Sequence, residues 1–312
     1  QPFRVNCAHH PQAETPPMAL ALLAILIVLA LGSLAPELVR LRQFLWLRSW
    51  LNWLDQRLGG QALWATEFGL ALALVPLLGL IALMDWTLGG TLHGLLKFAF
   101  GLAVLFLCWG PRDLDEDARR AARAESAADR SEALLALGAN ASAAPVRSVD
   151  LVDSVFVAGL TRWFGPLFWF VAFGPTGALG YRLAQLLAQS PELRSKLPAV
   201  QVEAAEQLHA ALAWLPAQLM TLALALASDF DAVGRAWRNH HAAHGQGLLH
   251  LDLGFLSATA RACVDLDDED FVSADGAPIR DESVEEARRL LWRLLIVWLA
   301  LLSIIVLAGW AA

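Results

Sequence analysis

The chain has little cysteine and little charge for its 312 residues. Its three cysteines, Cys7, Cys108 and Cys263, lie far apart, and no two of them have the C-x-x-C spacing. This scarcity excludes a disulfide framework and a thiolate metal site, and it disfavours redox chemistry. Charged residues make up 17% of the chain and the formal net charge is −7, which argues against a nucleic-acid partner.

Well-known catalytic motifs are missing as well. The sequence contains no G-x-x-x-x-G-K-[ST], no G-x-S-x-G and no H-E-x-x-H, so nucleotide binding, serine hydrolysis and zinc proteolysis have no motif to support them. We predict no cofactor. His240 and His244 could share a helix face as a metal pair, but no carboxylate or cysteine completes a known ligand spacing. A structural or solvated histidine cluster is therefore the favoured interpretation.

Apolar sequence, in contrast, is abundant. Hydrophobic residues make up 57% of the chain, and several runs are long enough to cross a bilayer as a helix. Most of the 13 tryptophans stand at the ends of these runs, where their rings prefer the headgroup level. We predict an all-α polytopic membrane protein with five to six transmembrane helices, the lower count applying if the first run does not cross. The apolar runs cover residues 18–34, 64–86, 92–109, 155–187, 202–227 and 290–310.

The stretches between these runs divide the chain into regions. Residues 1–17 are predicted to be a disordered tail or a segment before the true start at Met18. Arginines gather in alternate loops, so the two long polar loops are predicted to be cytoplasmic. The acidic residues from Asp113 to Asp117 suit a solvated helix N-terminus better than a catalytic role. The predicted regions are 1–17, 18–109 (an N-terminal helix, an amphipathic helix and a transmembrane hairpin), 110–154 (first cytoplasmic loop), 155–227 (central spans), 228–287 (second cytoplasmic loop) and 288–312 (last transmembrane helix).

The segment from Leu38 to Gly60 alternates leucine and tryptophan with arginine, a pattern typical of an amphipathic helix. Its apolar stripe is expected to include Leu41, Phe44, Leu45 and Trp53. Two interpretations stay open. The helix lies on the membrane surface, or it extends the first span and packs on the rest of the protein.

Glycine and proline inside two of the apolar runs predict breaks in regular helix geometry. Proline at position 216 frees a backbone carbonyl near Leu212, and inside a membrane that carbonyl needs a partner. The predicted bends lie at Gly165, Pro166, Gly174, Pro175, Gly177 and Pro216.

The second of these bends leads into a short polar stretch that contains Tyr181, Arg182 and Gln185. A guanidinium beside an amide can hold a phosphate or carboxylate through paired hydrogen bonds. We expect these three residues, with Arg162 across the segment, to bind an anionic headgroup or a phosphate-bearing ligand at the membrane edge. A topological anchor at the membrane interface is the alternative interpretation.

The same region carries a family resemblance. The stretches GPLFWF and GPTGALGYRLAQL, with the Trp-Leu-Pro-Ala-x-Leu pattern from Trp214 to Leu219, resemble the AmpE branch of the CobD/CbiB-like family of integral membrane proteins. The enzymes of that family typically carry E-N-x-S-D, T-L-D-S-M and S-P-N-[AS] elements, and this chain has none of the three. Gly159 to Arg162 and Leu183 to Leu187 stand in the places of the first two. The resemblance therefore implies a protein without catalytic activity.

AmpE-like proteins are regulatory proteins of the cell inner membrane, linked to β-lactamase induction, antibiotic resistance and cell-wall recycling. By this resemblance we expect a signalling role, with the lipid bilayer and a cell-wall amidase or a muropeptide-related ligand as partners. Two alternatives stay open. One is a cobalamin-biosynthesis amide ligase of the CobD/CbiB type, and the other is a transporter of a cell-wall fragment with its cavity near the predicted bends.

Overall fold

The computed structural model describes residues 17–34, 44–88, 94–110, 114–139, 146–243, 251–266 and 282–308. Within these ranges the regular structure is helical and no strand occurs, which confirms the predicted all-α class. In the first half of the chain, the helices are α1 (Pro17–Leu34), α2 (Leu45–Leu58), α3 (Phe68–Thr87), α4 (Gly94–Cys108), α5 (Leu114–Ala122) and α6 (Ala127–Leu137). The second half contains α7 (Ser148–Gly159), the π-helix η2 (Leu160–Phe164), α8 (Gly165–Gln189), α9 (Pro191–Arg194), α10 (Ala199–Ala227), α11 (Phe230–Ala243), α12 (Gly254–Arg261) and α13 (Glu282–Leu307).

In the described part of the chain, four helical segments are long and apolar enough to cross a membrane, namely α3, α10, α13 and the continuous segment α7–η2–α8. On α3, large apolar side chains such as Val75 and Leu80 are exposed, as expected where a helix faces lipid. These helices indicate a membrane protein. The runs predicted at 18–34 and 92–109 form α1 and α4, whose apolar stretches are shorter. The total of five to six spans therefore stays a prediction.

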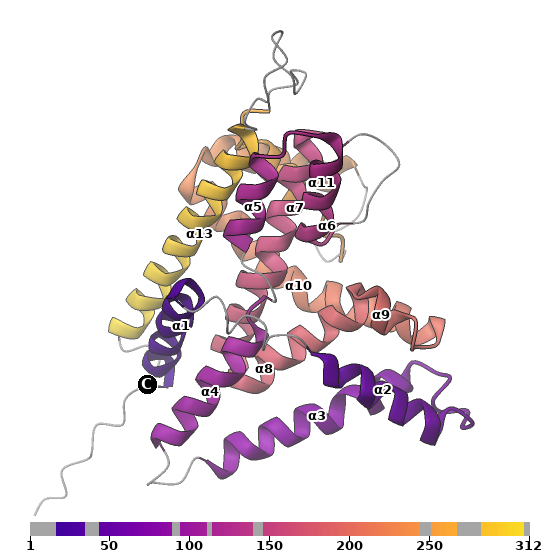
Figure 1. Ribbon diagram of the computed structural model, residues 1–312. Coiled ribbons are helices and arrows are strands. Elements are labelled where there is room, and N and C mark those ends of the chain that lie inside the picture. Colours follow the sequence, from indigo (N-terminus) through magenta and orange to yellow (C-terminus); the bar gives the residue numbers. More distant parts are fainter. Residues whose placement is uncertain are drawn as a thin grey trace, which may run out of the picture.

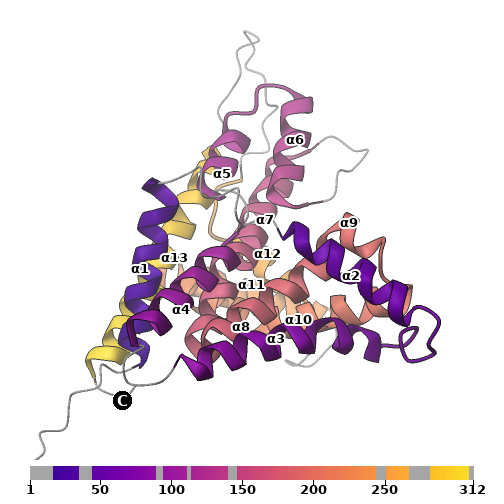
Figure 2. The same ribbon diagram turned by 60° about the horizontal axis from the view of Figure 1, so that its bottom comes forward.

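The helices α8 and α10 lie at the centre and pack against each other. Helices α3 and α4 both pack on α8, while α13 packs on α10 and α7 and lies beside α1 (Figures 1 and 2). The polar helices α5 and α6 gather around α7 at one end of the molecule, and α12 packs on α7 and α11 (Figure 1). The described parts of the predicted polar loops are thus mostly helical, and they lie at one end of the apolar helices.

The amphipathic segment forms α2, but its buried face differs from the predicted one. Leu47, Leu51 and Leu54 are buried, whereas Leu45 is 70% exposed and Trp53 is 48% exposed. The face that packs on protein is thus a different one from the predicted stripe, which stays exposed at these two positions. Leucines at i, i+4 and i+7 form a continuous row on one helix face, and this row is the one that packs on protein.

Helix α2 lies against protein on this side. It packs on α9, and the indole N–H of Trp50 donates a hydrogen bond of 3.0 Å to the Ala73 carbonyl of α3. Phe44 directly precedes the helix, and Leu41 lies outside the described residues. These contacts support the interpretation in which the segment packs on the rest of the protein.

A π-helix occupies the turn before the first predicted bend. Pro166 has no backbone N–H and cannot bond the carbonyl of Arg162, four residues earlier. The N–H of Gly165 reaches back to Leu160 instead, and the N–H of Gly110 donates to the Arg162 carbonyl at 3.3 Å. The wider turn therefore keeps the backbone hydrogen-bonded although proline interrupts the ladder, and Gly110, two residues after α4, supplies the missing donor.

The second predicted bend lies inside α8. Gly174 has φ 63° and ψ −151°, a combination that only glycine adopts readily, and Phe173 before it is also non-helical. The chain folds so sharply here that a β-carbon at Gly177 would overlap the Trp169 carbonyl. Glycine is thus required at two positions, at Gly174 for the backbone angles and at Gly177 for the close approach of the chain.

The proline in α10 has the consequence that the sequence predicts. The helix runs from Ala199 to Ala227 through Pro216, which leaves the Leu212 carbonyl without its usual intrahelical donor. The indole N–H of Trp169 on α8 donates to this carbonyl at 2.9 Å. A side chain from the neighbouring central helix therefore satisfies the polar group that proline frees.

Candidate functional site

The predicted polar stretch lies on the second half of α8, inside the helix bundle. Tyr181 is 1% exposed, Arg182 is 2% exposed and Gln185 is 8% exposed. The Arg182 guanidinium donates to the Gln185 side-chain carbonyl, and the Gln185 amide donates to Gln189 at 3.0 Å. The Phe44 ring lies 6.0 Å from the guanidinium carbon, within the range of a cation–π contact. The structure thus brings together three of the four predicted site residues.

A histidine from α10 completes this buried cluster. The rings of His209 and Tyr181 are 5.6 Å apart, and His209 is 6% exposed. Among the residues that the structure describes, neither the Tyr181 hydroxyl nor His209 Nε2 has a hydrogen-bond partner. Gly165 makes room for the tyrosine, because a β-carbon at that position would overlap its ring. Each of the two atoms is therefore a buried polar atom with unused hydrogen-bonding capacity.

The fourth predicted residue, Arg162, is held in another set of contacts. It lies on η2, is 6% exposed, and forms an ion pair of 2.8 Å with Asp117 of α5. A second guanidinium nitrogen donates to the Ala136 carbonyl of α6 at 2.5 Å. Its side-chain stem lies against Gly110, where no β-carbon would fit. Arg162 thereby joins the π-helix to both polar helices.

Arg162 contacts Gly110 just after the end of α4, whereas Arg182 lies in the buried cluster on α8. Because both guanidinium groups are buried, neither presents its donors at an open surface in this conformation. Binding of an anionic ligand by Arg182 and Gln185 stays a prediction, and it requires the cluster to open.

The two predicted metal candidates are only partly described. His240 Nε2 lies 2.9 Å from an Asp252 carboxylate oxygen, while His244 lies outside the described residues. The neighbouring His241 contacts the Trp237 carbonyl through Nδ1 at 2.8 Å. Among the residues that the structure describes, no group of three histidine, cysteine, aspartate or glutamate side chains is placed to hold a metal ion.

Sequence reasoning missed two residues of these clusters. Asp117 was expected on a solvated face, yet it is 2% exposed because it faces Arg162. His209 was not singled out, although an ionisable residue inside an apolar run is a recognised signal of a functional or structural polar contact. The segments that contact Asp117 and His209 lie far away in the sequence, so a local pattern does not reveal the contacts.

Comparisons of this chain with protein-family models, with curated proteins and with solved structures found no match.

Proposed function

We propose that this protein is a regulatory protein of the cell inner membrane that relays cell-wall state through its polar helices, without catalysis, as the AmpE resemblance implies. Its output would be β-lactamase induction, and its partners would be a cell-wall amidase or a muropeptide-related ligand. One structural observation carries the proposal, namely the way in which carboxylate–arginine contacts tie the polar helices to the apolar ones.

The first two of these contacts lie on α5. Asp115 accepts from Arg288 of α13 at 2.5 Å, and Asp117 pairs with Arg162 of η2 at 2.8 Å. Residues two apart on a helix point to different sides, so α5 is held between two apolar segments at once. A relative movement of these segments would therefore change the position of α5.

The third contact links the other polar region to the same apolar segment. Arg261 of α12 pairs with Asp153 of α7 through two nitrogens, and hydrogen bonding to this carboxylate raises the pKa of the arginine. Both polar regions are thus connected to the continuous segment α7–η2–α8. A relay needs such a connection, because a site can bias an effector surface only through an element that both of them contact.

The test is β-lactam induction in a deletion strain of the host, measured as β-lactamase activity. Wild type should restore normal induction, whereas Arg261→Gln should restore less, because it uncouples α12 from α7 at a partly exposed pair and is expected to fold. Arg235→Gln is the matched control, since Arg235 is an exposed arginine of the same polar region. Membrane levels of all variants are compared by immunoblotting.

The same deletion strain distinguishes the regulatory proposal from the two alternative functions. Unchanged induction together with failure of cobalamin-dependent growth would overturn the regulatory proposal in favour of the amide ligase. Saturable uptake of a cell-wall fragment by vesicles that contain the purified protein, again with unchanged induction, would overturn it in favour of a transporter. Arg182→Lys tests the ligand prediction separately, because lysine keeps the charge but loses the planar, two-point hydrogen bonding of arginine.

A further inference from the structure

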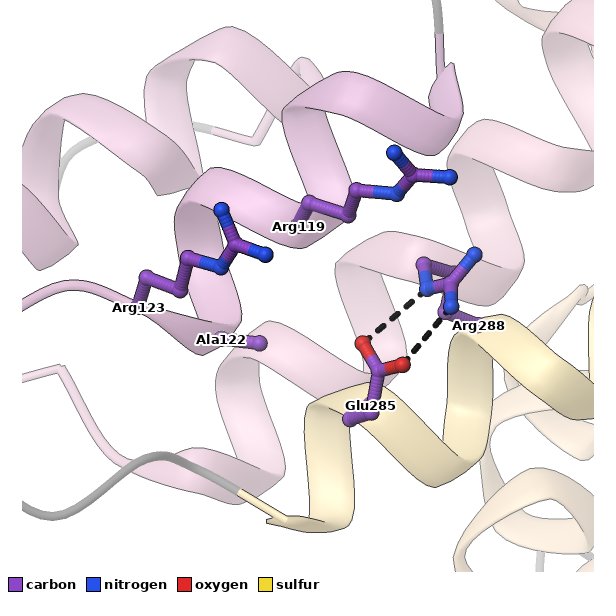
Figure 3. A pocket seen from close by; sticks show the side chains of 5 residues that line it. All are labelled: Arg119, Ala122, Arg123, Glu285 and Arg288. Carbon is purple, nitrogen blue, oxygen red and sulfur yellow. Dashed lines mark hydrogen bonds and ion pairs between the residues drawn. The ribbon is translucent and has the colours of Figure 1, made fainter.

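A small cavity lies between α5 and the first two turns of α13, away from the buried cluster on α8. It has a volume of about 180 Å³ and is lined by Arg119, Ala122, Arg123, Glu285 and Arg288. Figure 3 shows the side chains of Arg119, on α5, and Arg123, directly after α5, beside Glu285 and Arg288 of α13. Arg119 and Arg123 are four residues apart and therefore share one face of the chain at the end of α5.

Positive charge dominates this cavity. Glu285 is engaged by Arg288 through two hydrogen bonds, of 3.0 and 2.7 Å. Asp115, beside the cavity, is approached by Arg119 at 2.6 Å and by Arg288 at 2.5 Å. The three guanidinium groups thus face two carboxylates, which leaves one positive charge in excess.

Arg123 is the arginine of this cavity that pairs with neither Glu285 nor Asp115. Its side chain is exposed, and among the described residues it has no ion-pair partner. A guanidinium carries five N–H donors in a planar fork that matches the oxygens of a phosphate group. An anion in the cavity would therefore gain the donors of Arg123 without breaking the contacts that hold Arg288 and Glu285 in place.

A tryptophan beside the cavity supports a position near the membrane surface. Trp292 follows Arg288 by one turn and is 38% exposed. Exposed tryptophans at the ends of apolar helices prefer the headgroup level. The apolar part of α13 continues beyond Trp292, so we expect the arginines to lie at the height of lipid phosphates.

From this geometry we propose that Arg119, Arg123 and Arg288 form a binding site for a phosphate monoester group. The group is carried by a membrane lipid of the phosphatidic acid type or by a soluble phosphate compound, and both offer the same oxygens to the arginines. Glu285 and Asp115 hold two of the three guanidinium groups in position, and Arg123 supplies the charge that favours binding. The site stands on its own geometry and does not depend on the proposed regulatory function.

The experiment uses the full-length protein purified in a neutral detergent. Native mass spectrometry measures apparent dissociation constants for phosphatidic acid, for phosphatidylglycerol and for inorganic phosphate. We compare wild type with Arg123→Gln and Arg123→Glu. The matched control is Arg120→Gln, because Arg120 is an exposed arginine of α5 that pairs with Glu116 at 3.0 Å and does not line the cavity.

We expect phosphatidic acid to bind more tightly than phosphatidylglycerol, whose phosphate is a diester. Arg123→Gln should weaken binding about five- to tenfold, the usual effect of losing one charge-assisted contact, and Arg123→Glu should weaken it further. Arg120→Gln should stay within about twofold of wild type, because a distant exposed charge is screened. Equal unfolding temperatures of the variants show that the change lies in binding.

Competition separates the two sources of phosphate. If inorganic phosphate does not displace phosphatidic acid, the occupant is a lipid headgroup. If inorganic phosphate binds by itself and depends on Arg123 in the same way, the occupant is a soluble phosphate compound. Equal losses for Arg123→Gln and Arg120→Gln, or no binding of any of the three probes, would overturn the proposal.

Discussion

Arg162 and Asp117 form an ion pair of 2.8 Å between side chains that are only 8% and 2% exposed. They come from segments 45 residues apart, and the pair fixes α5 against the π-helix at the head of α8. Removing one partner from a buried ion pair leaves an uncompensated charge, which costs more than the pair itself contributes. The position of α5 therefore depends on this contact more than on the exposed pairs around it.

Asp117→Asn should accordingly destabilise the folded protein by about 3–5 kcal/mol, because the Arg162 charge stays buried without its carboxylate. Thermal unfolding in detergent measures the effect. The neighbouring Glu116→Gln is the matched control, since Glu116 pairs with Arg120 where the two side chains are 48% and 61% exposed. It should cost about 0–1 kcal/mol. Equal unfolding temperatures for the two variants would show that the buried Arg162–Asp117 pair contributes no more to stability than the exposed pair.

A second prediction concerns the bend in α8. Gly174→Ala should cost about 1–3 kcal/mol, because an alanine is strained at φ 63° and ψ −151°. Gly79→Ala in α3 is the control, since Gly79 is helical and no atom lies within 4 Å of the position of its added β-carbon. That substitution should be neutral or stabilising by up to about 1 kcal/mol. If Gly174→Ala unfolds at the wild-type temperature, the backbone at Phe173 and Gly174 is not strained as described.

The bend at Gly174 and the interrupted backbone hydrogen bonds at Pro166 and Pro216 could be predicted because they depend on local covalent chemistry. Proline lacks an N–H and glycine lacks a β-carbon in any context. The effect of Pro166, Gly174 and Pro216 on the backbone can therefore be predicted from the sequence alone. The need for a partner at the Leu212 carbonyl follows in the same way. The identity of that partner, Trp169, could not be predicted, because it depends on how α8 and α10 pack.

The side-chain clusters were less predictable for the same reason. Asp117 has the sequence context of a solvated helix N-terminus, and only the approach of Arg162 from a distant segment makes it buried. Lys97 is another case, because Asp85 from the preceding helix lies 3.5 Å from its ammonium group. Local periodicity predicts which residues share a helix face, but it does not predict which neighbour that face meets.

A third prediction concerns Cys263, which follows α12 and lies 3.1 Å from the Ser228 hydroxyl. Burial raises the pKa of this thiol above its ordinary value, and the hydrogen bond between it and Ser228 lowers it to a smaller extent. A raised pKa means less thiolate at a given pH, so alkylation should be slower than in denatured protein and should accelerate as the pH rises toward that pKa.

The measurement uses maleimide labelling of a Cys7→Ser variant over a range of pH. Cys108 is fully buried and should stay unlabelled until the protein unfolds. Ser228→Ala should shift the labelling profile to higher pH, because it removes the interaction that lowers the pKa. A profile that matches denatured protein in both variants would contradict the assigned environment of Cys263.

The last prediction concerns the contact between Trp169 and the Leu212 carbonyl. Trp169→Phe keeps an aromatic ring but removes the N–H donor, and it should cost about 0.5–2 kcal/mol, because a carbonyl among apolar helices is left unpaired. In a Pro216→Ala background the alanine supplies its own backbone N–H to Leu212, so the same substitution should cost less. A double-mutant cycle on unfolding free energies measures this difference directly. Equal costs in the two backgrounds would mean that the indole does not compensate for the proline, and the contact would then be one of packing alone.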